Sequence, residues 1–317
     1  YSAEVEKQKI ASKAGLYIEI DSSGTIKARR KDGTAVTLPG DVITRKPNQF
    51  VDARRDPTKT KKVTVYELDS GKLKSLIETP GSSAGTYIEN FNPATDWNGV
   101  VYVGFTSSSA DLNFTGLRVI NAETGVAGKG VPSRGADKGF TLATNNALYV
   151  KGHFNADGNL STGSATVPES NEVPCALYGD SVTLLSNNWN DASTATKPDA
   201  SATEIAAAIV TGIRPSGALG KAEGSGGAHN LPRFLENWGG LKNVIRGSLV
   251  CLYESEVDFT IWSVDYYAPP NRNWGFSQLF RDGTFPPGTP LIRNYRRTDF
   301  RELSADEYSA ALAALGS

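Results

Sequence analysis

The chain has 317 residues and a formal net charge of −1, with 33 Lys and Arg against 34 Asp and Glu. This balance lacks the basic excess with which proteins bind nucleic acid or anionic membrane surfaces, so neither partner is expected. Hydrophobic residues make up 39% of the chain, with 32 Gly and 16 Pro, which favours a globular fold of many short strands and turns. Because no apolar run reaches about 18 residues, we expect no membrane span.

The ends and the sulfur-containing residues suggest an exported chain. It starts at Tyr1 and contains no Met, which predicts either a processed chain or one trimmed of its leader. Long exposure to an oxidising exterior would explain the missing Met, and compositional drift is the alternative. Cys175 and Cys251 are either two buried thiols or one disulfide. We favour the disulfide, which would close a long loop and stabilise the fold by about 4 kcal/mol.

The first unit is expected over residues 1–80. Residues 3–14 have the pattern of a short helix that ends at Gly15. Turns at Gly24 and Gly33 then separate strand-like runs and predict a small antiparallel meander. The runs cover residues 16–20, 25–29 and 34–38, and a strand over 63–68 and a short helix over 70–77 follow.

Residues 81–252 are expected to form the main body. Short apolar segments recur there roughly 18 to 37 residues apart, with turns of Gly, Asn, Asp and Ser between them. Such spacing, without strong helices between the strands, predicts a mainly β fold in which a right-handed parallel β-solenoid is wound from successive coils. A Greek-key β-sandwich is the alternative. The segments lie at 100–103, 117–120, 140–142, 148–150, 182–185, 208–210 and 244–252.

The stretch from His229 to Leu252 is predicted to close this body. Pro232 suits the first position of a short helix, which would place Phe234, Leu235 and Trp238 on one face as an apolar plug. Arg233 and Glu236, three residues apart, are expected to form a buried ion pair that fixes the plug. These residues and the two cysteines are structural candidates, and no residue is assigned to catalysis or to a cofactor.

Residues 253–317 are expected to wrap around the body. Residues 254–265 read as an edge strand, and the proline-rich and aromatic stretch 266–276 as an extended segment without regular structure. Residues 305–315 predict a helix, whose start is marked by the capping-box spacing of Ser304 and Glu307.

Several groups of residues are candidate binding sites. The basic run from Arg54 to Lys62 could bind polyanions, but Asp52 and Asp56 beside it favour a solvated loop. His153 and His229 are too few for a zinc site and are expected in hydrogen-bonded turns. No nucleotide, hydrolase or metalloprotease motif occurs.

Asp157 and its neighbours are candidate ligands for a calcium ion. Asn155, Asp157 and Asn159 alternate with small residues, so their oxygens could converge on Ca²⁺. An Asx turn is the favoured interpretation, since Glu169 lies too far along the chain to complete an EF-hand loop. Five tryptophans could stack on sugars, although packing explains tryptophan more often. They are Trp97, Trp189, Trp238, Trp262 and Trp274.

Longer strings carry a family resemblance. HNLPRFLENW, RGSLV, YYAPPNRNWGF and FPPGTPLIRNYRRTDFREL in the C-terminal part resemble the PilX-like proteins associated with bacterial type IV pili, although position 231 is Leu where an aromatic residue is commoner. Residues 50–73 and the strings GLRVINAETG, NALYVKGHFN and ALYGDSVTLLSNNWND look similar to the same family. That family usually has an N-terminal pilin-like membrane helix, which this chain lacks.

The resemblance implies a non-enzymatic, extracellular or cell-surface protein that self-associates or binds pilus components, as a filament subunit or an adhesive tip. The alternative is a β-helix protein that binds or cleaves carbohydrate, with a glycan as its partner.

Overall fold

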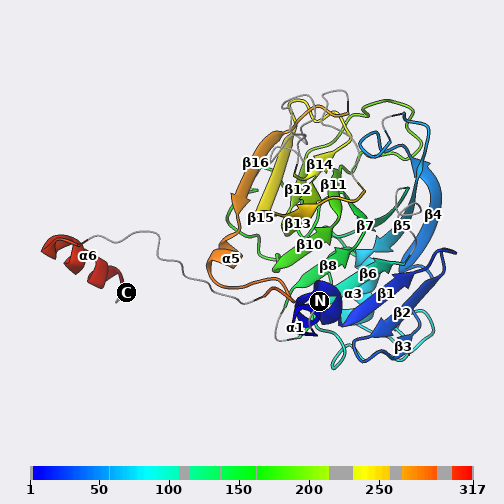
Figure 1. Ribbon diagram of the computed structural model, residues 1–317, viewed down its shortest axis with the longest axis horizontal. Helices are drawn as coiled ribbons and strands as arrows, with labels where there is room; N and C mark the ends of the chain where they lie inside the picture. Colours follow the sequence, from blue (N-terminus) through cyan, green and yellow to red (C-terminus); the bar gives the residue numbers. More distant parts are fainter. Residues whose placement is uncertain are drawn as a thin grey trace.

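The computed structural model describes residues 3–56, 58–106, 114–135, 138–161, 163–213, 231–257, 266–290 and 302–315. Their strands form one sheet of ten strands and one of six, and most neighbouring strands are parallel. Figure 1 shows the two sheets as neighbouring layers of one body. Among the described residues, no helix is both long enough and apolar enough to cross a bilayer.

The N-terminal elements follow the expectation closely. Helices α1 (Ala3–Gln8) and α2 (Ile10–Lys13) precede strands β1 (Leu16–Ile20), β2 (Ile26–Arg30) and β3 (Ala35–Val36). The predicted meander is present, because β1 pairs with β2 and β2 with β3, both antiparallel. β1 also pairs in parallel with β6, so the meander extends the large sheet instead of forming a separate unit.

The ten-stranded sheet runs in the order β12-β15-β13-β10-β8-β6-β1-β2-β3, and β16 pairs with β15. From β1 to β16 all its pairings are parallel. Its remaining strands are β6 (Val100–Phe105), β8 (Phe140–Thr144), β10 (Cys175–Gly179), β12 (Thr203–Ile205), β13 (Ala208–Ile213), β15 (Lys242–Glu254) and β16 (Asn271–Phe276).

The six-stranded sheet runs in the order β14-β11-β9-β7-β5-β4. Only its β4–β5 pair is antiparallel. Its strands are β4 (Ile43–Phe50), β5 (Val63–Asp69), β7 (Thr115–Ile120), β9 (Ala147–Lys151), β11 (Ser181–Leu185) and β14 (Arg233–Phe234), and helix α3 (Ser70–Glu78) follows β5.

The main core draws its side chains from both sheets and therefore lies between them. Side chains alternate between the two faces of a strand, so in-register residues on parallel strands form apolar rows. Val101, Leu142, Leu177 and Ile209 make one row on the large sheet, and Val119, Val150, Leu184 and Phe234 face them from the small sheet, all at most 1% exposed.

The predicted architecture is wrong in both of its forms. The chain is a mixed α/β structure of two mostly parallel sheets, not one β-solenoid, and the parallel pairing also rules out the antiparallel β-sandwich. Strand spacing does not reveal which strands become partners. Both sheets have antiparallel strands at one end. In addition, the single long strand β15 pairs with three strands, β12, β13 and β16, whereas each strand of a uniformly wound coil has two neighbours.

The helical plug is also wrong. Pro232 follows a cis peptide bond and precedes β14, which pairs with β11. Because a strand alternates its side chains, Phe234 enters the main core while Leu235 packs in a second cluster on the opposite face of the small sheet. Trp238 is fully buried beside Phe234, with ring centroids 5.3 Å apart. The anchoring residues are therefore buried as expected, but from an extended segment.

The C-terminal part differs similarly. Residues 271–276 form β16 instead of an irregular wrap, and α5 (Gln278–Arg281) follows. The expected edge strand over 254–265 lies largely outside the described residues. Helix α6 (Ala305–Leu315) confirms the terminal helix and its capping box, since the Ser304 hydroxyl oxygen accepts the Glu307 N–H and the Glu307 carboxylate accepts the Ser304 N–H.

Candidate functional site

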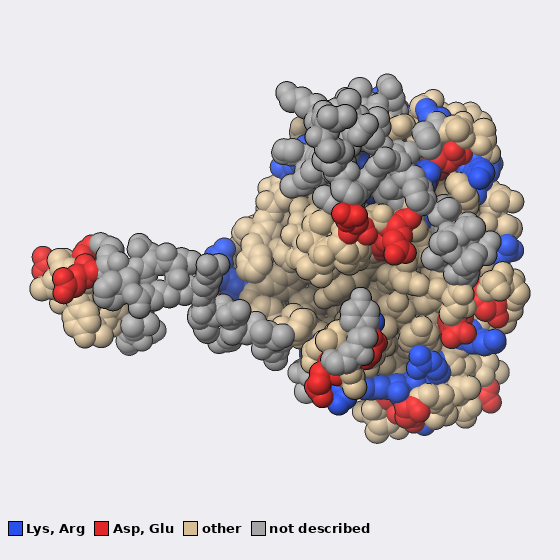
Figure 2. Space-filling model, in the orientation of Figure 1, with Lys and Arg blue, Asp and Glu red and all other residues tan. Residues whose placement is uncertain are grey.

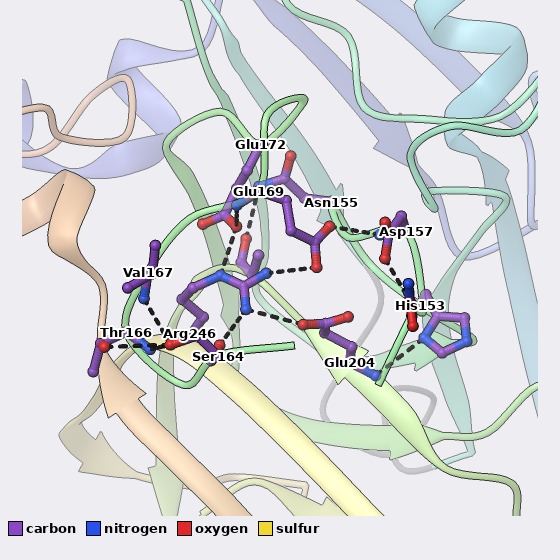
Figure 3. Close-up of polar contacts among 12 residues, drawn as sticks. His153, Asn155, Asp157, Ser164, Thr166, Val167, Glu169, Glu172, Glu204 and Arg246 are labelled. Carbon is purple, nitrogen blue, oxygen red and sulfur yellow. Dashed lines mark hydrogen bonds and ion pairs between the residues drawn. The ribbon is translucent and has the colours of Figure 1, made fainter. Parts of the chain in front are cut away.

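Several charged side chains gather around Arg246 on β15. The loop from 152 to 174, between β9 and β10, folds over β12 and β15 at this point (Figure 3). On β12, Ile205 enters the main core while the neighbouring Glu204 points to the opposite side, under the loop. The loop thus converts an outward strand position into a buried one, since Glu204 and Arg246 are both 0% exposed.

Three carboxylates hold Arg246. Its Nε lies 2.6 Å from Glu172 Oε2, one terminal nitrogen 2.9 Å from Glu204 Oε1, and the other 3.2 Å from Glu169 Oε1. The guanidinium also donates to the Ser164 carbonyl oxygen. A buried arginine requires such compensation, because an unpaired buried charge costs several kcal/mol.

One carboxylate oxygen of Glu204, Oε2, is buried and accepts no hydrogen bond from the described residues. Burial raises the pKa of Glu204 to about 7, against the opposing effect of its hydrogen bond to Arg246, and the nearby Glu169 carboxylate raises it further. The site therefore concentrates more negative charge than its single guanidinium balances.

Asp157 completes the group. Carboxylate oxygens of Asp157, Glu169 and Glu204 all lie within 4.8 Å of one another. The Asp157 backbone N–H donates to Glu169 Oε2 at 2.8 Å, which brings together two acidic residues twelve positions apart. Asp157 is exposed, Glu169 half-buried and Glu204 buried, so the group opens to solvent on the Asp157 side.

The predicted calcium ligands are thus only partly those that the fold assembles. Asn155 is fully buried, and its side chain bonds to the backbone of Val173 and Ala206. Asn159 donates its N–H to Asp157 Oδ1, as the predicted Asx turn requires. Glu169, which lies too far along the chain to complete an EF-hand loop, is nevertheless next to Asp157 in the fold. No sequence pattern indicated Glu204 as a calcium ligand.

His153 supports the same site from its edge. Its Nδ1 accepts the backbone N–H of Glu204 at 3.1 Å, a turn contact of the predicted kind. Burial lowers the pKa of His153, although Glu123, Asp157 and Glu169 oppose that effect. The neutral ring with Nδ1 as acceptor follows from this environment. His229 lies outside the described residues.

The basic run is not a fully solvated loop. Arg54 and Arg55 are at most 2% exposed, and Asp52 beside them is 1% exposed. Asp52 accepts the Tyr149 hydroxyl at 2.8 Å, and Arg55 donates to the Thr115 carbonyl oxygen at 2.7 Å. The first half of the run therefore belongs to a buried polar network, whereas Lys59, Lys61 and Lys62 remain exposed as expected.

The predicted pair between Arg233 and Glu236 does not form. Arg233 lies 3.9 Å from Asp52, on the side of the small sheet away from the main core. Glu236 is fully buried and accepts the N–H and the hydroxyl of Ser186 at 2.7 and 2.6 Å. Burial raises the pKa of Glu236 to about 7, although both Ser186 hydrogen bonds oppose the shift.

The predicted disulfide is absent. Cys175 is buried in the main core and Cys251 is exposed, and both are free thiols. Burial raises the pKa of Cys175 well above its ordinary value, which disfavours the reactive thiolate.

Three of the described tryptophan side chains are buried. Trp97, Trp189 and Trp238 are each at most 8% exposed, and Trp274 is half-buried. Trp262 lies outside the described residues. Trp189 borders a cavity of about 290 Å³ together with Phe50, Leu235 and Tyr266, but its indole N–H already bonds to Asp191.

The outward face of the large sheet carries an uncharged row. Register places Tyr17, Tyr102, Ala143, Tyr178, Val210 and Val250 side by side on six neighbouring strands. We call these six residues the outer row. Leu252, two positions beyond Val250 at a β-bulge in the β13–β15 pairing, is 66% exposed. Figure 2 shows a largely tan surface around β8, β10 and β15, with charged residues of both signs gathered elsewhere.

Comparison of the chain with protein-family models, with curated proteins and with solved structures found no match.

Proposed function

We propose that this chain is a non-enzymatic structural subunit of an exported, pilus-associated or related surface assembly, in which copies of the chain associate through the outer row. The resemblance of its C-terminal strings to PilX-like proteins motivates the setting. The observation that supports self-association is the outer row together with the exposed Leu252, because contiguous apolar patches on a soluble protein mark interaction surfaces. Ala143 and Val210 are 0% and 5% exposed, so the accessible part of the row is formed by the half-buried Tyr17, Tyr102, Tyr178 and Val250.

The chemistry of the row suits a protein partner. Burial raises the pKa of Tyr102 to about 12 and also raises that of Tyr178, so these phenols already lie in poorly solvated surroundings. Tyrosine gives large, rigid contact area with a polar tip, which is why it is enriched at interfaces. A second copy offers the same surface, and symmetric pairing of identical patches is the commonest form of assembly.

A glycan is the weaker candidate for the same face. Sugars stack on free aromatic ring faces, but the rings of Tyr17 and Tyr102 stack on each other with centroids 5.2 Å apart. The Arg29 guanidinium covers Tyr17 as well, 3.9 Å from its ring centroid. The burial of Trp97, Trp189 and Trp238 further weakens the case for a sugar-binding groove.

Light scattering coupled to size exclusion tests this proposal. We expect wild type to elute as concentration-dependent oligomers, and Leu252→Arg and Tyr102→Arg to shift toward the monomer, because buried charge in an apolar interface is strongly unfavourable. Val167→Arg is the matched control, since Val167 is 54% exposed and outside the row. Monomeric wild type, or oligomers unaffected by both variants, would refute the proposal, and glycan-array binding lost in Tyr102→Arg would replace it with the carbohydrate function.

A further inference from the structure

We propose that Asp157, Glu169 and Glu204 form a calcium site that joins the 152–174 loop to strand β12. Nothing in the proposed self-association requires this site, since none of its three carboxylates belongs to the outer row. The inference rests on the unsatisfied oxygen of Glu204, on the geometry of the three carboxylates and on the local charge (Figure 3).

The unsatisfied oxygen is the central observation. A buried carboxylate oxygen without a donor costs free energy, so native proteins satisfy such atoms with a hydrogen bond, water or an ion. Glu204 is 0% exposed, and its Oε1 already binds Arg246 at 2.9 Å. Asp157 and Glu169 each place a carboxylate oxygen within 4.8 Å of one of the Glu204 oxygens. Both neighbours are acceptors when ionised, so neither donates to the unsatisfied Oε2, whereas a bound cation would contact all three carboxylates.

The spacing suits calcium. Oxygens on opposite sides of Ca²⁺, each at about 2.4 Å, are about 4.8 Å apart. The three carboxylates lie within 4.8 Å of one another and therefore fit around this ion. Calcium also accepts irregular sets of six to eight oxygens, roughly, including carbonyls and water, and so tolerates ligands from a loop and a strand.

The charge points the same way. The group contains four carboxylates, those of Asp157, Glu169, Glu172 and Glu204, and the single guanidinium of Arg246 pairs with the last three of them. A divalent cation on the Asp157 side would offset the excess without displacing Arg246. The exposed Asp157 carboxylate provides the route from solvent, and His153 and Asn159 hold the backbone on either side through their hydrogen bonds.

Calorimetric titration of CaCl₂ into the chelator-treated full chain tests the site. We expect one Ca²⁺ per chain with a dissociation constant of about 0.1 to 1 mM, the range of extracellular calcium modules. Asp157→Asn and Glu204→Gln should each weaken binding at least tenfold, roughly the loss of one charged ligand. Asp282→Asn, an exposed aspartate in the turn after α5, is the control and should bind as wild type does.

A second readout keeps the test decisive where Glu204→Gln fails to fold. Calcium should raise the melting temperature of wild type and of Asp282→Asn but not of Asp157→Asn, whose substitution is at an exposed position. The site is refuted if wild type shows no heat and no thermal shift up to about 10 mM Ca²⁺, tenfold above the weakest expected affinity. Unchanged binding in Asp157→Asn, or tighter binding of Mg²⁺ than of Ca²⁺, would contradict it equally.

Discussion

Removing the guanidinium of Arg246 should destabilise the chain more than any exposed charge change. Arg246→Met keeps most of the side-chain volume but leaves Glu172 and Glu204 unpaired, and these carboxylates are 2% and 0% exposed. Removing one partner of a buried ion pair typically costs about 3 to 5 kcal/mol. Because Glu169 remains partly solvated at 20% exposure, we assign its share little weight and expect a loss of about 4 kcal/mol.

Urea denaturation measures this loss as a lower midpoint at an unchanged slope. Arg281→Met, an exposed arginine at the end of α5, should stay within about 0.5 kcal/mol of wild type. The double variant Arg246→Met with Glu204→Gln should lose less than the sum of its single variants, by about 0.5 to 3 kcal/mol, because both touch one ion pair. A loss below about 1 kcal/mol for Arg246→Met, or strict additivity, would show that these carboxylates are well solvated.

Three further predictions concern other parts of the chain. The folded pKa of Glu236 is about 7 against 4.5 for the free group, so wild type should lose stability as the pH rises between these values. Glu236→Gln, which cannot ionise, should match wild type near about pH 5 but be more stable by about 3 kcal/mol near about pH 8; equal pH profiles in chemical denaturation would contradict this. Trp238→Ala should cost about 3 to 5 kcal/mol in the same assay, since the ring is fully buried, and a cost below about 1 kcal/mol would mean that it is not. Iodoacetamide followed by mass spectrometry should label Cys251 in the native chain and Cys175 only after unfolding; resistance of both until a reductant is added would restore the disulfide.

Local patterns predicted the elements far better than their partners. The alternation and turn signals around Gly24 and Gly33 located the meander, and Ser304 with Glu307 located the start of α6. The sequence after Pro232 predicts a helix because apolar residues one and four positions apart can share a helical face. The same residues also suit a strand that is covered on both faces, because neighbouring side chains then each pack in an apolar layer.

The site was harder to predict because its members are brought together by pairing between distant segments. Glu204 and Arg246 lie 42 positions apart, and only the β12–β15 register makes them neighbours. The burial of Arg55 has the same origin, since its partners Tyr149 and Thr115 lie on strands far along the chain. Charge patterns along a sequence indicate which residues need partners, but the sheet order determines which partners they meet.

Negative-stain electron microscopy tests the assembly role most directly. The account predicts that purified wild type forms paired or larger particles, that Leu252→Arg gives only single-chain particles, and that Val167→Arg behaves as wild type does. Single-chain particles from wild type at every concentration, or paired particles that persist in Leu252→Arg, would contradict the assignment of the outer row as the surface through which copies associate.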